Sequence, residues 1–254
     1  MIFITPGRQK IEKAISIFLA LAIWQVGAML LDNSLLLVTP AAVAKRLVSL
    51  LAEPDFLSSV GFSLVRIISG FLLALVAGSV LSVIAGRFRP AETLLWPYMT
   101  AIKTVPVASF IILCLIWLSS KNLSTFISFL MVLPIIYTNM LQGIKSTDRQ
   151  LLEMAQLFRA GWLKKMKYIY IPHIKPYLLS ACSVSIGLSW KSGIAAEVIG
   201  IPDGSIGEKL YEAKVYLSSG DLFAWTIVIV VLCIAFDKLF LLLLKKLFVR
   251  LEKS

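Results

Sequence analysis

The stretch EMAQLFRAGWLKKMKYIYIPHIKP, residues 153–176, is a polar and basic interruption in a chain that is otherwise a series of apolar segments. Of the 254 residues, 59% are hydrophobic and 15% are charged, whereas soluble domains average about 45–50% and about 25%. This composition predicts a membrane protein. The net charge of +11 does not indicate nucleic-acid binding, because most cations lie beside apolar segments and not in a basic patch interleaved with aromatic residues.

Six apolar segments around this stretch are long enough, or nearly so, to cross a bilayer, which takes about 20 residues of helix. They lie at about 11–31, 59–86, 104–119, 122–143, 177–200 and 222–244. The sequence therefore predicts an all-α polytopic membrane protein with about six transmembrane helices. The first segment resembles a signal peptide in its charge order, but it is long and no small-residue cleavage site closes it, so we expect a retained anchor.

Lysine and arginine are distributed unevenly between the two sides of these segments. One side holds sixteen of them: Arg8, Lys10, Lys13, Arg87, Arg89, Lys145, Arg149, Arg159, Lys164, Lys165, Lys167, Lys175, Lys245, Lys246, Arg250 and Lys253. The other holds five: Lys45, Arg46, Lys121, Lys209 and Lys214. Because cytoplasmic loops are enriched in these residues, we expect both termini in the cytoplasm.

This orientation divides the chain into regions. Residues 1–10 form the expected cytoplasmic N-terminus, and residues 11–254 form a single transmembrane domain. Within that domain, about 145–176 is a cytoplasmic loop, and about 32–58 and 201–221 are external segments. The first external segment contains a Thr-Pro helix start signal followed by apolar residues at helical spacing, which predicts a short amphipathic helix over 39–52.

The cytoplasmic loop has the pattern of a helix, a turn and a second helix. Asp148 is suited to cap the first helix, whose apolar residues recur at helical spacing: Leu151, Ala155, Phe158 and Trp162. Gly161 permits a sharp turn, a basic amphipathic segment follows, and Pro172 and Pro176 end it. On composition alone, a basic loop that lies on anionic lipid headgroups explains the stretch equally well.

Two parts of this loop resemble a family signature. Glu153, Met154 and Ala155, followed by Ile169 to Pro172, are similar to the opening Glu-Ala-Ala and the closing Ile-x-Leu-Pro of binding-protein-dependent ABC importer permeases, at matching separation. Other stretches resemble the nitrate, sulfonate and taurine branch: SLVRIISGFLLALVAG at 63–78, KTVPVA at 103–108, Trp190 with AAEV at 195–198, the turn from Gly204 to Gly207, and Asp237. The resemblance covers nearly the whole chain from about Leu37 onward. The loop departs from the pattern at Arg159, where the family has Gly, and at Met154 and Ile171.

The resemblance implies a type I ABC importer permease fold and a transporter whose subunits have separate roles. Two six-span permeases enclose the path, two ATPase subunits that bind ATP and Mg dock underneath, and an external solute-binding protein delivers the substrate. A second copy of this chain is the expected partner permease, and a paralogue is the alternative. The implied location is the bacterial inner membrane, where the chain contacts lipid as a multi-pass protein.

The same resemblance implies that the loop is the coupling helix that sits in a groove of the ATPase. We therefore expect Glu153, Ala155, Phe158 and Gly161 to belong to the docking element. Ile169 and Pro172 would fix the return of the chain to the membrane.

The chain carries no pattern for catalysis or cofactor binding. It has no G-x-x-x-x-G-K-[ST] phosphate loop, so it is not expected to be an enzyme or to hydrolyse ATP itself. His173 is the single histidine, and the three cysteines lack the paired spacing of a zinc site. We expect no metal and no cofactor on this chain.

Ionisable residues inside predicted spans indicate the translocation path. A charged side chain at the bilayer centre costs at least about 2.5 kcal/mol on insertion scales, so Lys191 and Glu197 are expected to face a cavity or a partner helix. With Trp190 they are candidates for the path, and Lys191 would form a cationic wall for an anionic substrate. The alternative is that Lys191 bonds to a carboxylate or carbonyl for packing. Lys191 and Glu197 are six residues apart and would pair only if the helix breaks at Gly193.

The expected function is that of a permease subunit of an ATP-driven importer, which forms the path for a small polar or anionic solute and couples to a separate ATPase. The resemblance implies a sulfonate, taurine, nitrate or vitamin-precursor solute. An ion-gradient-driven secondary transporter or channel subunit is the alternative, and it leaves the loop signature unexplained. A membrane scaffold or sensor would explain the loop but not the charged interior.

Overall fold

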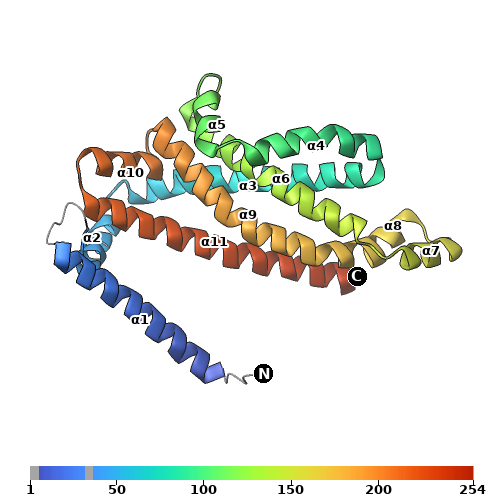
Figure 1. The fold of residues 1–254 in the computed structure, drawn as a ribbon, viewed down its shortest axis with the longest axis horizontal. Coiled ribbons are helices and arrows are strands. Elements are labelled where there is room, and N and C mark those ends of the chain that lie inside the picture. The colour runs from blue at the N-terminus through green and yellow to red at the C-terminus, as the bar shows by residue number, and fades with distance from the viewer. Residues whose placement is uncertain (1–5, 32–36, 254) are drawn as a thin grey trace. The chain divides into compact units, whose positions relative to one another are not determined.

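The structure is a computed structural model that describes residues 6–31 and 37–253, and every regular element within them is helical (Figure 1). The predicted all-α class is confirmed. The elements are α1 Pro6–Leu31, α2 Pro40–Leu51, α3 Phe56–Arg87, α4 Arg89–Thr104, α5 Val107–Cys114, α6 Ser120–Lys145, α7 Arg149–Leu157, α8 Trp162–Lys165, the π-helix η1 Met166–Tyr170, α9 Ile171–Gly200, α10 Ile206–Val215 and α11 Ser219–Lys253. Parts of the predicted N-terminal and first external segments, residues 1–5 and 32–36, lie outside the described residues.

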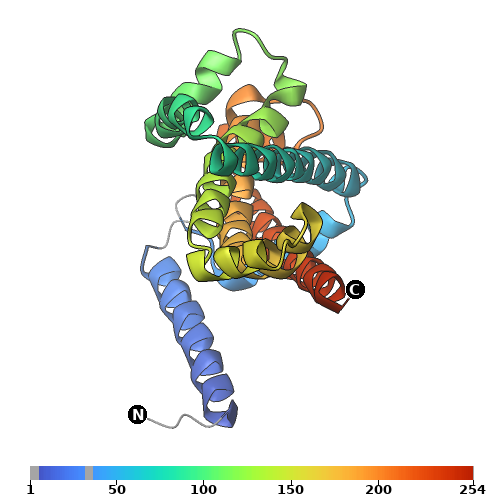
Figure 2. The same ribbon diagram turned by 90° about the vertical axis from the view of Figure 1, so that its right-hand side faces the viewer.

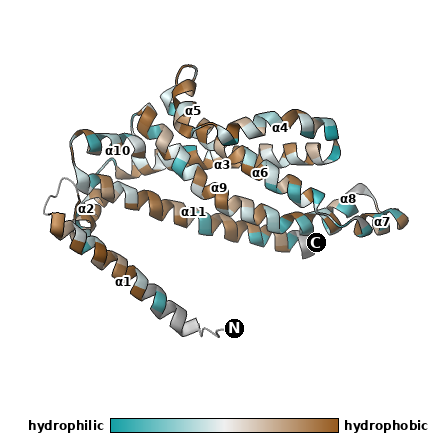
Figure 3. Ribbon diagram, viewed as in Figure 1, coloured by the Kyte–Doolittle hydropathy of each residue, from teal (hydrophilic) through white to brown (hydrophobic). Residues whose placement is uncertain are grey.

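Three helices of the described chain, α3, α6 and α11, are long and apolar enough to cross a membrane. The bent pair α4 and α5 makes a fourth span if it is counted as one. The apolar part of α1 covers 17 residues, Ile15–Leu31. The chain is thus a polytopic membrane protein, and Figure 3 shows apolar colouring along most of α11 next to hydrophilic stretches in α7 and α8.

The third predicted segment, 104–119, differs most from the structure. Helix α4 ends at Thr104, α5 runs only from Val107 to Cys114, and the two helices are bent by 103°. The cause is Pro106, which disfavours helical backbone at the preceding residue, and Val105 is indeed extended at φ −72° and ψ 131°. The predicted segment therefore contains the break and the short helix α5, and an additional helix, α4, precedes the break.

The chain divides into two compact units, one of residues 1–57 and 209–228 and one of residues 58–208 and 229–254. The core of the second unit is the packing of α6 against α9 (Figure 2). Helix α6 is its central element, since 61% of the apolar window of α6 is buried, compared with 33% for α3. A cluster of buried side chains from α5, α6 and α9 fills one end: Ile111, Cys114, Leu123, Ile127, Met131 and Ala196.

Glycines bring α3 close to α6 within this unit. A side chain at Gly70 would collide with the carbonyl oxygen of Thr125. A Cβ atom at Gly86 would lie 2.9 Å from Ile144 Cγ2. Small residues commonly allow such close approach between membrane helices, where van der Waals contact drives packing.

The first unit contains the predicted external helix. Thr39 caps α2 by accepting a hydrogen bond from the Ala42 N–H through its Oγ1 at 3.4 Å, and Pro40 follows it, which confirms the Thr-Pro start signal. Aromatic pairs add to the core of this unit, with Phe56 and Trp225 stacked at a centroid separation of 5.5 Å.

Candidate functional site

The loop between α6 and α9 forms the predicted helix and turn. Helix α7 begins after Asp148, whose carboxylate accepts a hydrogen bond from the Gln150 N–H at 2.8 Å. Ala155 is buried. On the same helix and its C-cap, by contrast, Leu157 is 84% exposed and Phe158 is 80% exposed. The loop therefore presents two adjacent apolar side chains that its own fold does not cover.

Arg159, and not Gly161, makes the sharp turn that ends α7. Arg159 has a φ of 49°, and the Ala160 N–H donates to the Ala155 carbonyl at 2.9 Å while the Arg159 N–H donates to the Gln156 carbonyl at 3.0 Å. These two bonds define a Schellman motif, in which the left-handed residue is most often Gly. This is the position at which the chain departs from the family pattern. Gly161 has open space around it, since an added Cβ would meet nothing within 4 Å.

The return to the membrane passes through a short helix and a π-helix, where the sequence predicted one basic helix. Ile169 is buried within η1, and His173 Nδ1 lies 3.1 Å from the Ile169 carbonyl oxygen. Pro172 stands in the first turn of α9, where its missing N–H costs no hydrogen bond. π-Helical turns are rare and occur frequently at functional sites.

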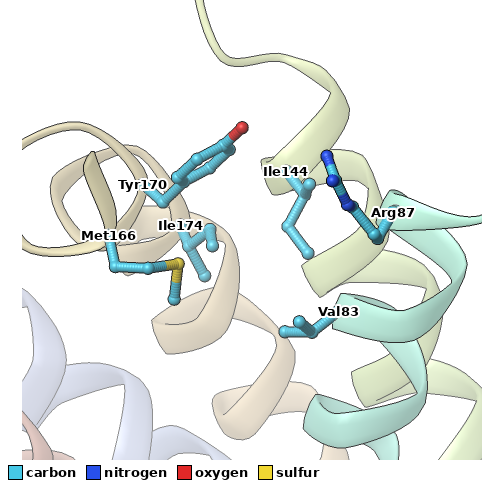
Figure 4. Close-up of a pocket in the computed structure, with 7 residues that line it drawn as sticks. Val83, Arg87, Ile144, Met166, Tyr170 and Ile174 are labelled. Carbon is cyan, nitrogen blue, oxygen red and sulfur yellow. The ribbon is translucent and has the colours of Figure 1, made fainter. Parts of the chain in front are cut away.

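A cavity of about 130 Å³ lies where this return meets the ends of α3 and α6 (Figure 4). Its lining comes from α3 (Val83, Gly86 and Arg87), from α6 (Ile144), from η1 (Met166 and Tyr170) and from α9 (Ile174). Figure 4 shows Arg87 and Tyr170 on opposite sides of this space. The return segment thus faces α3 and α6 across a shared cavity.

The three residues predicted for the translocation path are not brought together. Trp190 is 1% exposed and Glu197 is fully buried, whereas Lys191 is exposed. Helix α9 continues unbroken past Gly193, where an added Cβ would lie 2.6 Å from Ser128 Oγ. Lys191 and Glu197 therefore do not pair.

Glu197 holds the turn before α10 against α9. Its Oε2 accepts hydrogen bonds from the Ser63 hydroxyl at 2.6 Å and from the Gly207 N–H at 3.3 Å. Its Oε1 has no hydrogen-bond partner among the described residues. This arrangement gives Glu197 a role in joining α3, α9 and the turn before α10.

A cavity between α4 and α6 contains polar side chains to which the sequence analysis gave no role in a site. It includes Lys103, Tyr137 and Lys145. The signal in the sequence was Lys103 itself, an isolated cation next to an apolar segment, but its neighbours on α6 could be identified only from the fold.

Comparison with known proteins agrees with this architecture. Residues 70–250 match the family described as "Binding-protein-dependent transport system inner membrane component". A solved structure of an amino acid ABC transporter with histidines shares the fold, with a TM-score of 0.55 and 18% identity, over 79% of this chain and 94% of that chain.

Three relatives carry transport names. The chain is 25% identical over 248 residues to a Bacillus subtilis chain named as an aliphatic sulfonates transport permease, covering 95% of this chain and 89% of the relative. It is 25% identical to a nitrate import permease of Leptolyngbya laminosa, covering 76% and 71%. It is 23% identical to a formylaminopyrimidine transport permease of Halalkalibacterium halodurans, covering 77% and 78%. Because the family match spans most of its length, this chain belongs to the family of binding-protein-dependent transport system inner membrane components.

Proposed function

We propose that this chain is the permease subunit of an ATP-driven importer, and that its cytoplasmic loop docks on a separate ATPase. The observation that carries the proposal is the exposed apolar pair at the end of α7, Leu157 and Phe158. A contiguous apolar patch on an otherwise polar loop is typical of a protein interface. A loop that only rested on lipid headgroups would not need the fixed turn at Arg159 that holds this pair in place.

The geometry of the loop supports the proposed coupling element. Ala155 packs inward and fixes the face of α7, so that Glu153, Phe158 and Gly161 remain at the surface available to the ATPase. Ile169 and Pro172 lie in the return segment beside the cavity of Figure 4. Closure of the ATPase pair would move this loop as a rigid body and shift the attached spans between inward and outward states.

The remaining subunits follow from the family. The partner ATPase would bind ATP and Mg, a solute-binding protein would deliver substrate from outside, and a second copy of this chain would complete the path. Both termini would lie in the cytoplasm of a bacterial cell, with the chain as a multi-pass protein of the inner membrane. This chain itself would bind no cofactor.

The proposed solute is small and polar or anionic. Relatives of the chain are named for aliphatic sulfonates, nitrate and formylaminopyrimidine. We place the solute in the sulfonate, taurine, nitrate or vitamin-precursor class. A secondary transporter or channel subunit is the competing proposal, and it gives no role to the exposed pair on α7.

Capture of the partner ATPase tests the docking surface. We expect Leu157→Asp and Phe158→Asp to abolish retention of the ATPase on the purified permease, since each change places a charge in an apolar contact. Gln150→Asp, at the other end of α7, is the matched control and should retain it. Gly161→Leu is a further probe, because the open space at Gly161 means that a larger side chain can obstruct only a partner. Full retention of the ATPase by all three loop variants would contradict the docking assignment.

A further inference from the structure

A cavity of about 260 Å³ lies between α4 and α6 of the second unit. Its lining combines polar and apolar side chains, although α6 is one of the apolar spans: Glu92, Trp96, Met99, Thr100, Lys103, Tyr137, Thr138, Leu141, Gln142 and Lys145. A water molecule occupies about 30 Å³ in the liquid, so the cavity has room for a small solute. Polar side chains inside spans commonly mark substrate or ion pathways.

The charges in this cavity do not balance, because its lining contains two cations, Lys103 and Lys145, and one carboxylate, Glu92. Lys145 Nζ and the Glu92 carboxylate form an ion pair at 2.5 Å. Lys103 Nζ donates to the neutral hydroxyl of Thr138 at 3.3 Å. Among the residues that the structure describes, no carboxylate forms an ion pair with Lys103, and the lining carries a net positive charge.

The fold fixes the backbone at Lys103, whose side chain is exposed. It lies in the last turn of α4, next to the break imposed by Pro106. A cation is favoured at this end of a helix by the helix dipole. Since α4 cannot continue past the break, Lys103 stays at the bend between α4 and α5.

Tyr137 provides a second, independent indication of a ligand. The residue lines the cavity and is 3% exposed, yet its hydroxyl has no hydrogen-bond partner among the described residues. A buried hydroxyl without a partner loses its hydrogen bonds to water and gains none within the protein. A ligand or water molecule in the cavity would restore a bond to this donor.

We propose that the cavity is an anion-binding subsite on the translocation path, in which Lys103 and Tyr137 bind the oxyanion group of a small singly charged solute. The proposal rests on the proposed importer function and specifies its substrate class as anionic. It assigns the recognition of charge to Lys103 on α4 and not to Lys191 on α9. A lysine ammonium and a phenol hydroxyl are both donors, which suits a sulfonate or nitrate oxygen.

Equilibrium dialysis of radiolabelled ethanesulfonate against the permease and its ATPase in lipid nanodiscs, without the binding protein, tests the subsite. We expect Lys103→Met to weaken binding about tenfold or more, as for the loss of a charge-assisted hydrogen bond, and Tyr137→Phe to weaken it severalfold. Lys103→Arg should bind ethanesulfonate nearly as well as the wild type. This result would show that the charge at this position, and not a folding defect, determines binding. Lys121→Met is the matched control, since Lys121 lies on α6 about 25 Å along the helix from Thr138.

Unchanged binding in Lys103→Met would overturn the subsite, and so would equal binding of the neutral analogue ethyl methyl sulfone by the wild-type protein. Uptake by proteoliposomes that contain the complete complex separates this result from failure of the importer itself. ATP-driven uptake with unchanged binding in Lys103→Met removes only the subsite. Absence of ATP-driven uptake by the wild-type complex removes the proposed function.

Discussion

The hydroxyl of Ser63 donates a 2.6 Å hydrogen bond to the buried carboxylate of Glu197 and accepts a 2.9 Å hydrogen bond from the Ile206 N–H. One hydroxyl therefore joins α3, α9 and the start of α10. Because both partners are fully buried, water cannot replace a bond that is lost.

Ser63→Ala should destabilise the protein by about 1–3 kcal/mol, since it leaves the Ile206 N–H unpaired and removes a donor from Glu197. Unfolding by SDS in mixed micelles measures this change. Ser59→Ala is the matched control on α3, because the Ser59 hydroxyl is buried and makes no hydrogen bond to a described residue. Equal losses in the two variants would show that the Ser63 bonds contribute nothing.

Gly70→Ala should lower the free energy of unfolding by about 1–3 kcal/mol, the usual range for overpacking. Its Cβ would collide with the Thr125 carbonyl oxygen and force α3 away from α6. Gly61→Ala, on the same helix, adds a Cβ that meets nothing within 4 Å and should be neutral or slightly stabilising. Thermal unfolding in detergent compares the two, and a stable Gly70→Ala protein would refute close packing of these helices.

Arg159→Gly should stabilise the end of α7 by about 1 kcal/mol, because Gly adopts a φ of 49° without the steric cost that a Cβ imposes. Amide exchange at Ala160, whose N–H closes the turn, should slow roughly fivefold. Arg159→Ala keeps the Cβ and separates this effect from loss of the arginine side chain. If Arg159→Ala slows exchange as much as Arg159→Gly, backbone strain is not the cause.

Arg46 forms ion pairs with Asp221 and Glu53 in the first unit. Partial burial lowers the pKa of Arg46, but hydrogen bonds to Asp221 and Glu53 outweigh that effect and raise the pKa above its ordinary value, so Arg46 remains charged. A double-mutant cycle with Arg46→Ala and Asp221→Ala should give a coupling of up to about 1 kcal/mol, because the pair is partly exposed. The coupling should decrease in 1 M salt, where screening is strong. If the effects of the two single changes on the free energy of unfolding simply add, the pair contributes no coupling energy.

The sequence predicts those elements whose signals are local. The Thr39-Pro40 start of α2 and the Asp148 cap of α7 were both identified, because a cap depends on a few adjacent residues. The family resemblance also predicted the family correctly.

Features that depend on tertiary contacts were not predictable in the same way. The left-handed turn was expected at Gly161, but the Schellman bonds place it at Arg159. Similarly, Lys191 was a candidate path residue by its position in a span, but it does not lie near Glu197 in a shared site, and the cavity between α4 and α6 contains Lys103 instead. The neighbours of a nearly uniform apolar helix, and not its own residues, decide which of its faces is buried.

The most direct test of the importer is the ATPase activity of this chain reconstituted with its ATPase and binding protein, measured with and without a panel of loaded solutes. We predict that one loaded binding protein stimulates hydrolysis severalfold, and that Phe158→Asp removes the stimulation. If the purified chain neither retains an ATPase nor stimulates one with any solute, the account is contradicted and the gradient-driven transporter takes its place.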